Sequence, residues 1–459
     1  MLKQKLWRLT QILFHMNGPA LYTILFAVFF MKSFLALDPD FGWHIASGEY
    51  IVTHGIPYKD IYSYTAPDFA WVHHEWLADV INYTVYQNFG GYTAVAILYG
   101  ALWTLSVWLL ARSNPYRLIV LLTVVVMLPF VGVRAVAWSV LLFAVLILAS
   151  RQHFRRQLVY VPLLFLLWAN IHGSFVVGLV YLVWIALFGE QRHRTIVILT
   201  LSLVATLLNP YGIGIYIEVI RTTTDSSLHS RIGEWRPFQL DIATAALVGI
   251  WGGLIGVRYQ TFWQRVIRFE NLLLVMSILS ARHVVLFGLA FLSSFGTIVR
   301  SIKIPDTVWR DGTVRAMSGA AVGALCITIL YAATAEFQGY SWNREDPYPS
   351  QIASQLNIRP CSGSVFAHYD FGGYLIWKVP GQKLYIDGRM PSWELNGKKY
   401  MDDYLRIIND PVFQQQEFDQ HSVRCVIWSK DHDFAKRLLK DGWRVTQSES
   451  TNSIVLLEK

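Results

Sequence analysis

Three apolar segments of this chain are too long for a single membrane crossing, and each is interrupted once by polar residues. The segments are Leu118–Ser150, Leu158–Gly189 and Asn271–Val299, interrupted at Arg134, at Asn170-Ile171-His172-Gly173 and at Arg282-His283. A helix of about 32 residues would be roughly 48 Å long, whereas the hydrocarbon core of a membrane is about 30 Å thick. Each segment is therefore predicted to form a helical hairpin whose tip lies at the polar interruption.

Basic residues flank the apolar segments and predict their orientation. They include Arg112, Arg117, Arg151, Arg155, Arg156, Arg192, Arg194, Arg265, Arg268 and Arg300. Loops rich in Lys and Arg stay on the cytoplasmic side of a membrane, so the hairpin tips are predicted to lie outside. Counting from a first span at Ala20–Leu37 predicts about eleven transmembrane helices, with a cytoplasmic N-terminus and an extracytoplasmic C-terminus.

Charge is sparse along most of the chain and returns near its end. The chain is 54% hydrophobic and 15% charged, against roughly 25% charged residues in soluble proteins. Residues 335–459 hold 15 of the 39 Lys and Arg and 16 of the 31 Asp and Glu. We predict a polytopic α-helical membrane module over 1–336 and a small α/β soluble domain over 337–459. The basic flanks form no run dense enough to follow a phosphate backbone, so nucleic acid is excluded as a partner.

The predicted soluble domain alternates short apolar runs with helical patterns. Strands are predicted at Ser364–Ala367, Lys383–Ile386, Cys425–Trp428 and Ile454–Leu457, and helices at Lys398–Ile408 and Phe434–Lys440. Cys361 and Cys425 also fall in this domain. Outside the cytoplasm they could form a disulfide, and two buried free thiols are an equal alternative.

The loop after the first span begins with two acidic residues, in the sequence Asp38-Pro39-Asp40-Phe41-Gly42-Trp43-His44. Two carboxylates two residues apart at a membrane surface can act as a general base and its orienting partner, or as ligands of a divalent cation. The solvated end of a helix is the structural alternative. No other cofactor is indicated, because no Gly-rich nucleotide-binding sequence of the required spacing occurs.

Farther along the same loop, Trp71-Val72-His73-His74-Glu75-Trp76-Leu77 is predicted to form a helix at the membrane interface. Trp favours that interface in any membrane protein, so the two tryptophans are interpreted as anchors. His73, His74 and Glu75 are candidates for binding. The His-Glu-x-x-His spacing of zinc enzymes is absent, which disfavours zinc and leaves the metal undetermined.

Arg134, Arg282 and His283 lie at hairpin tips near the depth of the hydrocarbon. An ionisable side chain is costly there unless it faces water or a partner, so these residues are interpreted as functional. The guanidinium fork suits phosphate because it donates two parallel hydrogen bonds. The alternative is ion pairing with Glu218, Glu234 or Asp241.

Two further outer segments, Asn170–Ser174 and Asn209–Gly212, are typical of turns because of their Asn, Pro and Gly residues. The structural interpretation is preferred for both, although His172 shares the predicted outer face with the residues above. In all, seven outer segments contribute polar residues to that face, which suggests a site. They are the first outer loop and the segments at Arg134, Asn170–His172, Asn209, Glu218, Glu234 and Arg282–His283.

With these residues in view, the chain resembles the bacterial GT-C superfamily of integral membrane glycosyltransferases, in a branch of envelope proteins. The resemblance covers most of the chain. It rests on DPDFGWHIASGEYIVTHGIP (38–57), WVHHEWLADV (71–80), NIHGSF (170–175), NPYG (209–212), GGYLIW (372–377) and IDGR (386–389).

The resemblance implies an active site on the outer face of the bacterial inner membrane. GT-C enzymes carry an acidic residue or pair in a first outer loop with interfacial helices, which corresponds to 38–90 here. Asp38 and Asp40 would be catalytic, one of them deprotonating an acceptor hydroxyl in an inverting transfer. The donor would be a sugar on polyprenyl phosphate, and the acceptor an envelope glycan, lipid or protein. The residues expected to bind substrate or its phosphate are Arg134, Arg282, His283, His44, His74, Glu75 and His172.

Two other functions stay open at this point. A transporter or flippase for an envelope lipid could use the same polar residues, but the sequence lacks the inverted repeats typical of transporters. A non-catalytic envelope assembly protein would tolerate loss of Asp38 and Asp40, but not damage to residues 340–459.

Overall fold

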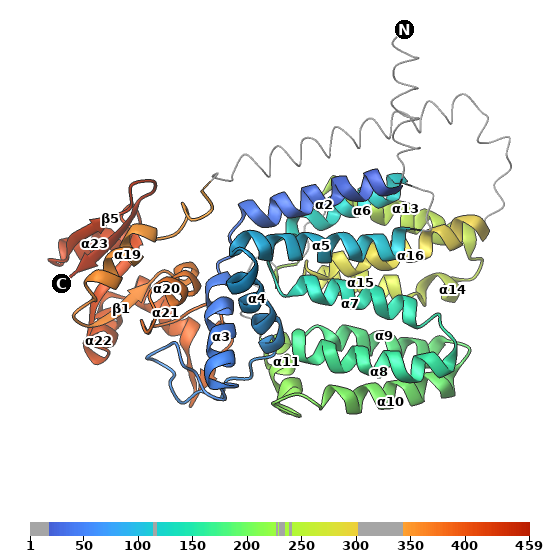
Figure 1. Ribbon diagram of the computed structural model, residues 1–459, viewed down its shortest axis with the longest axis horizontal. Coiled ribbons are helices and arrows are strands. Elements are labelled where there is room, and N and C mark those ends of the chain that lie inside the picture. Colours follow the sequence, from blue (N-terminus) through green and yellow to red (C-terminus); the bar gives the residue numbers. More distant parts are fainter. Residues whose placement is uncertain (1–17, 113–116, 226–227, 229–234, 238–240, 302–342) are drawn as a thin grey trace, which may run out of the picture. The chain divides into compact units, whose positions relative to one another are not determined.

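The computed structural model describes residues 18–112, 117–225, 228, 235–237, 241–301 and 343–459 (Figure 1). These residues form 19 α-helices and a small C-terminal sheet. The chain divides into two compact units. The first comprises Met1–Ser33, Ala96–Leu208 and His229–Tyr340, and the second comprises Phe34–Val95, Asn209–Leu228 and Ser341–Lys459. The predicted boundary at residue 336 lies outside the described residues, and the first outer loop groups with the C-terminal segment.

Helices make up the described part of the first unit. They are α2 (Gly18–Leu35), α5 (Tyr92–Ala111), α6 (Arg117–Met127), α7 (Val136–Ala149), α8 (Phe154–Ile171), α9 (Phe175–Phe188), α10 (Arg192–Thr206), α13 (Ile242–Arg258), α14 (Phe262–Val266), α15 (Phe269–Leu279) and α16 (His283–Ser301). The end of α2 from Phe34 and the start of α5 up to Val95 are assigned to the second unit. The three predicted interruptions are confirmed as breaks between helices. Arg134 lies between α6 and α7, His172 between α8 and α9, and Arg282 between α15 and α16.

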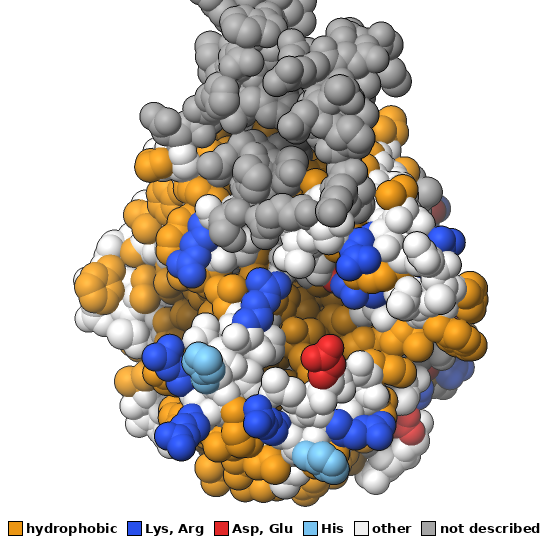
Figure 2. Space-filling view, turned by 90° about the vertical axis from the view of Figure 1, so that its right-hand side faces the viewer, with side chains coloured by type: hydrophobic (Ala, Val, Ile, Leu, Met, Phe, Trp, Pro, Cys, Tyr) orange, Lys and Arg blue, Asp and Glu red, His pale blue; other side chains and the backbone are white. Residues whose placement is uncertain are grey.

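Basic residues gather at one end of helices α7, α8 and α10. Arg194, at the start of α10, lies over the ring of Phe154 at the start of α8, 5.4 Å from its centroid. Ser150, just after α7, hydrogen-bonds Tyr181 of α9 at 3.1 Å. The basic residues in these turns and first helical turns are Arg151, Arg155, Arg156, Arg192 and Arg194. Figure 2 shows a face on which Lys and Arg side chains lie among hydrophobic ones, with few acidic side chains.

The polar interruptions belong to the other end of these helices. His172, after α8, lies 2.8 Å from the hydroxyl of Ser139, near the start of α7. Asn170, in the last turn of α8, donates to the carbonyl of Leu208 just after α10, at 3.1 Å. Basic turns and polar interruptions therefore lie at opposite ends of these helices, as the hairpin pattern predicts.

Two described helices are long and apolar enough to cross a membrane, Gly18–Leu35 and Tyr92–Ala111. The shorter apolar helices of 10–17 residues are Ile119–Phe130, Val136–Ala149, Phe175–Phe188, Ile242–Arg258, Phe269–Leu279 and His283–Val299. Helices α7 and α9 have 14 residues each, or about 21 Å at 1.5 Å per residue, less than the roughly 30 Å of a hydrocarbon core. Length and composition thus identify two candidate spans in the described part of the chain, where apolar spacing predicts about eleven.

A four-stranded mixed sheet forms the centre of the second unit. Its strands are β1 (Ser364–Ala367), β4 (Val423–Ser429), β5 (Arg444–Ser448) and β6 (Ile454–Glu458), in the order β1-β4-β6-β5. Strands β1 and β4 are parallel, with Val365 opposite Cys425, and β6 is antiparallel to both β4 and β5. Its helices include α19 (Ser350–Ile358), α20 (Gly372–Lys378), α21 (Tyr400–Asn409), α22 (Pro411–Gln420) and α23 (Asp433–Lys440), and β2 (Glu394–Leu395) pairs with β3 (Lys398–Lys399).

Three of the four strands predicted for this segment are confirmed, and so are both predicted helices. Lys383–Ile386 is not a strand, and this prediction was wrong. Leu384 forms only isolated bridges, to Val365 of β1 and to Ser63 of the first outer loop. Strand β5 was missed because its residues, Arg-Val-Thr-Gln-Ser, are mostly polar and exposed, as expected of an edge strand. Cys361 and Cys425 form a disulfide, which settles the alternative left open by the sequence.

The first outer loop contributes two helices to the second unit, α3 (Phe41–His54) and α4 (Trp76–Phe89), and residues 209–228 contribute α11 (Gly214–Thr224). Helices α3 and α4 pack against each other (Figure 1). The helix predicted over 71–77 is wrong for its first five residues, because α4 begins only at Trp76. Both helices end at glycines with positive φ, Gly55 at +88° and Gly90 at +111°, a conformation that residues with a Cβ adopt only with strain.

Candidate functional site

Close backbone contacts join the start of α3 to α20. A Cβ added to Gly42 would lie 2.1 Å from the carbonyl oxygen of Gly373, and one added to Gly373 would lie 2.2 Å from the carbonyl oxygen of Pro39. Only glycine permits this approach. The motifs DPDFGW and GGYLIW, which are more than 300 residues apart in the sequence, therefore meet in the structure.

The turn of the IDGR motif lies against Asp40. A Cβ at Gly388 would lie 1.8 Å from Oδ1 of Asp40, so the carboxylate rests on the backbone of this turn. The same Oδ1 accepts a hydrogen bond from the indole N–H of Trp43 at 2.9 Å. Asp40 precedes α3 but makes no side-chain capping bond to it. The carboxylate is thus held by the Trp43 indole and lies against the Gly388 backbone.

Asp38 supports the backbone of the same segment. Its Oδ1 accepts the backbone N–H of Asp40 at 3.0 Å. Both residues are part-buried just before α3, and the catalytic role of this acidic pair stays a prediction. Among the described residues, no group of three or more His, Cys, Asp or Glu side chains is arranged to hold a metal ion, and a divalent cation stays a prediction.

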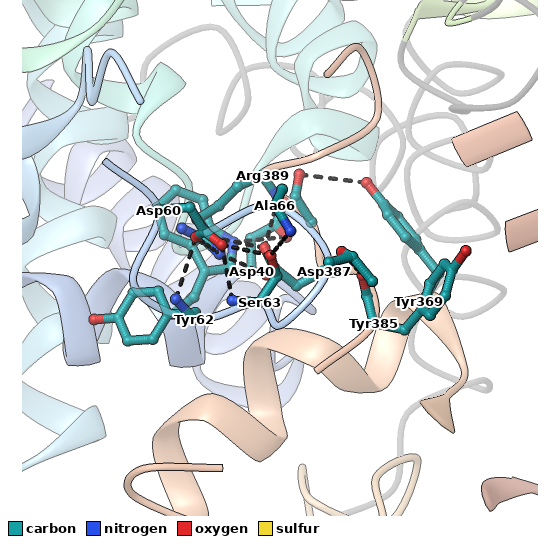
Figure 3. A network of polar contacts seen from close by, with 12 residues as sticks. Asp40, Asp60, Tyr62, Ser63, Ala66, Tyr369, Tyr385, Asp387 and Arg389 are labelled. Carbon is teal, nitrogen blue, oxygen red and sulfur yellow. Dashed lines mark hydrogen bonds and ion pairs between the residues drawn. The ribbon is translucent and has the colours of Figure 1, made fainter. Parts of the chain in front are cut away.

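Arg389 joins the IDGR turn to the first outer loop through a buried ion triad (Figure 3). Its Nε and Nη2 donate to the two oxygens of Asp387 at 2.8 and 2.7 Å, and Nη2 lies 2.8 Å from Oδ1 of Asp60. Asp60 also accepts the backbone N–H groups of Tyr62 and Ser63, at 3.2 and 2.9 Å. Both carboxylates therefore have partners, as buried charges require.

Aromatic rings surround the same guanidinium. Arg389 lies 4.7 Å from the ring centroid of Tyr62, 4.5 Å from that of Trp71 and 5.2 Å from that of Trp393. Its side chain is only 2% exposed. Burial opposes the charge, but Asp387 and Asp60 raise the pKa of Arg389 above its already high value. The arginine is therefore permanently charged and fixed in place.

A second buried cluster lies between α3 and α4. Asp79 of α4 is 0% exposed, and its two oxygens lie 2.6 Å from Nδ1 of His44 and 2.8 Å from Nε2 of His73. Burial alone would lower the pKa of His44, but the Asp79 carboxylate raises it to about 9. For His73 burial dominates, and it lowers the pKa despite Asp79. At neutral pH His44 is therefore cationic and His73 neutral.

Two of the predicted binding residues lie at the edge of this cluster. Oε2 of Glu75 is 3.7 Å from Nε2 of His44, and Oε1 is 3.8 Å from Nε2 of His74. The side chain of His74 is 34% exposed and that of Glu75 is 13% exposed. Carboxylates and imidazoles therefore alternate from the surface at His74 to the interior at His73.

The remaining predicted site residues belong to the first unit. Nδ1 of His172 accepts the backbone N–H of Ser174 at 3.2 Å. Arg282 stacks on the ring of Trp235 at 3.5 Å, and Nδ1 of His283 lies 3.2 Å from the carbonyl of Ser280. Arg134 lies in the segment before α7.

The acidic residues proposed as alternative partners of these arginines have other contacts. Glu218 forms an ion pair with Arg221. Asp241 caps α13 by accepting the backbone N–H of Thr244 at 2.7 Å, and Glu234 lies outside the described residues. The assignment of Arg134, Arg282, His283 and His172 to one site stays a prediction.

Sequence reasoning missed three contributors to the second unit. Asp79 stands within the apolar run of WLADV, Asp60 is one of several polar residues in its loop, and Gly388 lies between two charged residues in IDGR. Spacing within WVHHEWLADV offered one signal, since Asp79 lies four residues after Glu75 on the same helical face. No local signal could link Asp60 to Arg389.

No protein-family model matches this sequence, and no curated protein matches it. Solved structures do match the fold. An oligosaccharyltransferase of Archaeoglobus fulgidus in its apo form aligns with a TM-score of 0.55 and 11% identity, covering 89% of this chain and 70% of that one. The same organism's oligosaccharyltransferase AglB, with an inhibitory peptide and a dolichol-phosphate, aligns with a TM-score of 0.54 and 11% identity over 88% of this chain and 69% of that one.

A third structure, the A. fulgidus oligosaccharyltransferase tethered to an acceptor peptide, has a TM-score of 0.52 and 9% identity, and covers 96% of this chain and 74% of that one. At such identities the likeness concerns the fold. The fold of this chain is therefore similar, over most of its length, to that of the archaeal oligosaccharyltransferase AglB.

Proposed function

We propose that this protein is an inverting membrane glycosyltransferase that moves a sugar from a polyprenyl-phosphate donor to an envelope acceptor. The observation that carries the proposal is the fold similarity to AglB, one of whose matching structures contains a dolichol-phosphate. The carboxylate of Asp40 adds support, because it is fixed just after the first candidate span, within the first outer loop.

The proposed reaction has one base and one leaving group. Asp40 takes the proton of an acceptor hydroxyl while that oxygen forms a bond to the anomeric carbon of the sugar. The bond from the anomeric carbon to the phosphate oxygen breaks, and the lipid phosphate leaves with the bonding electrons. Positive charge develops on the sugar ring in the transition state, as in glycoside hydrolysis. Asp38 orients the backbone that carries Asp40.

The charge of the departing phosphate needs cationic donors. His44 is cationic at neutral pH and supports one such role. For the others, Arg134, Arg282 and His283, with His74, Glu75 and His172, the proposal rests on the chemistry of their side chains.

We propose that this reaction takes place on the outer face of a bacterial inner membrane. The gathering of Arg151, Arg155, Arg192 and Arg194 at one end of helices α7, α8 and α10 favours a cytoplasmic location for that end. The disulfide between Cys361 and Cys425 favours an oxidising, extracytoplasmic location for the C-terminal segment. The N-terminus would then be cytoplasmic, with about eleven spans in total.

The test compares Asp40→Asn, Asp38→Asn and a matched control in membranes supplied with labelled polyprenyl-phosphate sugars. Asp68→Asn is the control, because Asp68 lies in the same loop, is 79% exposed and pairs only with exposed Lys59 in the described structure. We expect Asp40→Asn to lower transfer about 100-fold or more, since general-base catalysis contributes roughly that much. Asp68→Asn should keep the wild-type rate.

Two results together would contradict the proposal. They are no transfer from any polyprenyl-phosphate sugar supplied, and wild-type envelope glycans in cells that carry Asp40→Asn. A phenotype that appears only when residues 340–459 are disrupted would instead support the assembly-protein function.

A further inference from the structure

The carboxylate of Asp40 is held from two directions by residues that the proposed reaction does not use. On one side lies the Cα of Gly388, where even a methyl group would overlap Oδ1 of Asp40 at 1.8 Å. On the other side the indole N–H of Trp43 donates to the same oxygen at 2.9 Å. The carboxylate therefore cannot rotate toward the turn without losing this hydrogen bond.

The turn that supports Asp40 is itself rigid. The backbone N–H of Met390 donates to the carbonyl of Asp387 at 3.0 Å, which closes a β-turn. The backbone N–H of Arg389 donates to Oδ1 of Asp387, also at 3.0 Å. The hydroxyl of Tyr369 donates to the carbonyl of Gly388 at 3.3 Å. These bonds fix Gly388 from both of its peptide groups.

The ion triad ties this turn to the loop that follows α3. Arg389 binds Asp387 through two donors and Asp60 through one, and Figure 3 shows Asp40 and Asp60 beside the turn. The loop is also joined to the segment just before the turn. Thr65 donates to the carbonyl of Tyr385 at 2.6 Å.

The side chain of Trp43 is held by burial and by ring packing. Its residue is 6% exposed, its ring centroid lies 3.6 Å from that of His44, and its indole edge lies near Gly373. The donor to Asp40 therefore comes from a side chain with no freedom to move away. A base held at one position avoids the loss of rate that a displacement of about 1 Å can cause.

We propose that Gly388, Arg389 and Trp43 are positioning residues for Asp40, so that the C-terminal segment builds the reaction site instead of serving as a separate binding domain. This inference rests on the proposed function of Asp40 as the base. It assigns a role to the IDGR turn that neither its sequence nor the fold similarity supplies. A purely structural role for the turn would stabilise the unit without affecting the ionisation of Asp40.

The first experiment compares Gly388→Ala with Gly214→Ala in the full-length protein. Gly214 lies in the same unit, and a Cβ there would make ordinary contacts of 3.6 and 3.7 Å, so it is the matched control. With the labelled polyprenyl-phosphate sugar that supports transfer, we expect Gly388→Ala to lower kcat at least about 10-fold with little change in KM for the donor. Gly214→Ala should keep the wild-type kcat.

The second experiment measures the pH profile of Trp43→Phe. Phenylalanine keeps an aromatic ring but removes the indole donor, and a hydrogen bond to the carboxylate favours its ionised form. The acid limb of the kcat profile should therefore move to higher pH. A structural role predicts an equal loss at every pH and an unmoved limb. Formation of the Cys361–Cys425 disulfide, seen on a non-reducing gel, checks that each variant folds.

The outcomes separate this inference from the proposed function. If Asp40→Asn transfers sugar as well as the wild type, Asp40 is not the base and this inference fails with it, although the transferase function itself stands. If no polyprenyl-phosphate sugar supports transfer by the wild type, and cells with Asp40→Asn keep wild-type glycans, the proposed function fails. If Asp40→Asn is inactive while Gly388→Ala and Trp43→Phe keep the wild-type kcat and pH profile, the function stands and this inference is overturned. Arg389→Lys should also lower kcat, because lysine lacks the two-donor fork of arginine. The loss should be smaller than in Gly388→Ala, because the positive charge is kept.

Discussion

Asp79 holds two histidines in different protonation states with a single buried carboxylate. His44 has a pKa of about 9 and is cationic at neutral pH, whereas the pKa of His73 is lowered and its ring is neutral. The distances of 2.6 and 2.8 Å allow both rings to bond the carboxylate at once. The two histidines therefore make the free energy of unfolding depend on pH in opposite directions. His44 binds a proton more tightly in the folded chain than in the unfolded chain, and His73 binds one less tightly.

The pH dependence of stability should report the His44–Asp79 pair. The folded pKa of His44, about 9, lies above the ordinary 6.5, so its stabilisation is fully present below pH 6.5 and is lost as pH rises through 9. The amount is at most about 3 kcal/mol. In Asp79→Asn this pKa should fall, so the variant should melt well below the wild type at pH 6 and approach it at pH 9.5.

Thermal unfolding of the detergent-solubilised chain between pH 6 and 9.5 measures this difference. Asp68→Asn provides the control, because that carboxylate is 79% exposed. A constant difference in melting temperature between Asp79→Asn and the wild type at all pH values would contradict the predicted protonation of His44.

The sequence predicted individual site residues only where a polar or charged residue interrupts or ends an apolar segment. Asp38 and Asp40 were noticed because they end an apolar span, and the structure places them together at the start of α3. Asp79 stands between apolar residues in a helix, and one sequence does not tell which polar residue turns inward. Its two partners come from α3 and from the loop before α4, which local spacing does not join.

At the scale of elements, glycine determines which parts of the chain can touch. The backbones of helices α3 and α20 are in close contact at Gly42 and Gly373. Both glycines stand within the motifs DPDFGW and GGYLIW. The segments that they contact were not predictable, because a glycine permits close approach of another backbone but does not identify which segment of the chain approaches.

The disulfide should stabilise the sheet of the second unit. Cys361 precedes β1 and Cys425 lies in β4, 64 residues apart in the sequence. Closing a loop of that length removes chain entropy from the unfolded state worth about 4 kcal/mol. Cys361→Ala with Cys425→Ala should therefore lower the melting temperature and increase proteolysis of residues 343–459. Cys326→Ala replaces the third cysteine of the chain, which is outside this disulfide, and serves as the control. Equal proteolysis of all three proteins would contradict the prediction.

At the scale of the whole chain, apolar spacing predicted where helices break but not which parts of the chain associate. Breaks at Arg134, His172 and Arg282 are confirmed, because a polar residue in an apolar run is a local signal. The grouping of Phe34–Val95 with Ser341–Lys459 depends on contacts such as Asp60 with Arg389, and these form between distant positions. Span number depends on length, and several of the apolar helices are short.

Reporter fusions test the predicted orientation. Alkaline phosphatase is active only outside the cytoplasm, so a fusion after Lys459 should be active. A fusion in the turn between α7 and α8, near Gln152, should be inactive, because that turn is flanked by Arg151, Arg155 and Arg156. Fluorescent-protein fusions at the same positions should show the reverse pattern. Equal phosphatase activity at both positions would contradict the topology.

The bond from Thr65 to Tyr385 spans 320 residues of sequence, and the ion triad of Asp60 and Arg389 closes over a similar length. A ribosome adding about 5–20 residues per second needs roughly 15 to 60 seconds to synthesise such a stretch. During that time Asp60 lacks its buried cation, and the surfaces of Phe69 and Trp71 that later face Trp393 and Arg389 are open to water. The segment 34–95 therefore completes its contacts only after the last quarter of the chain has been synthesised. Messages truncated before residue 389 should leave a loop that quality-control proteases can degrade.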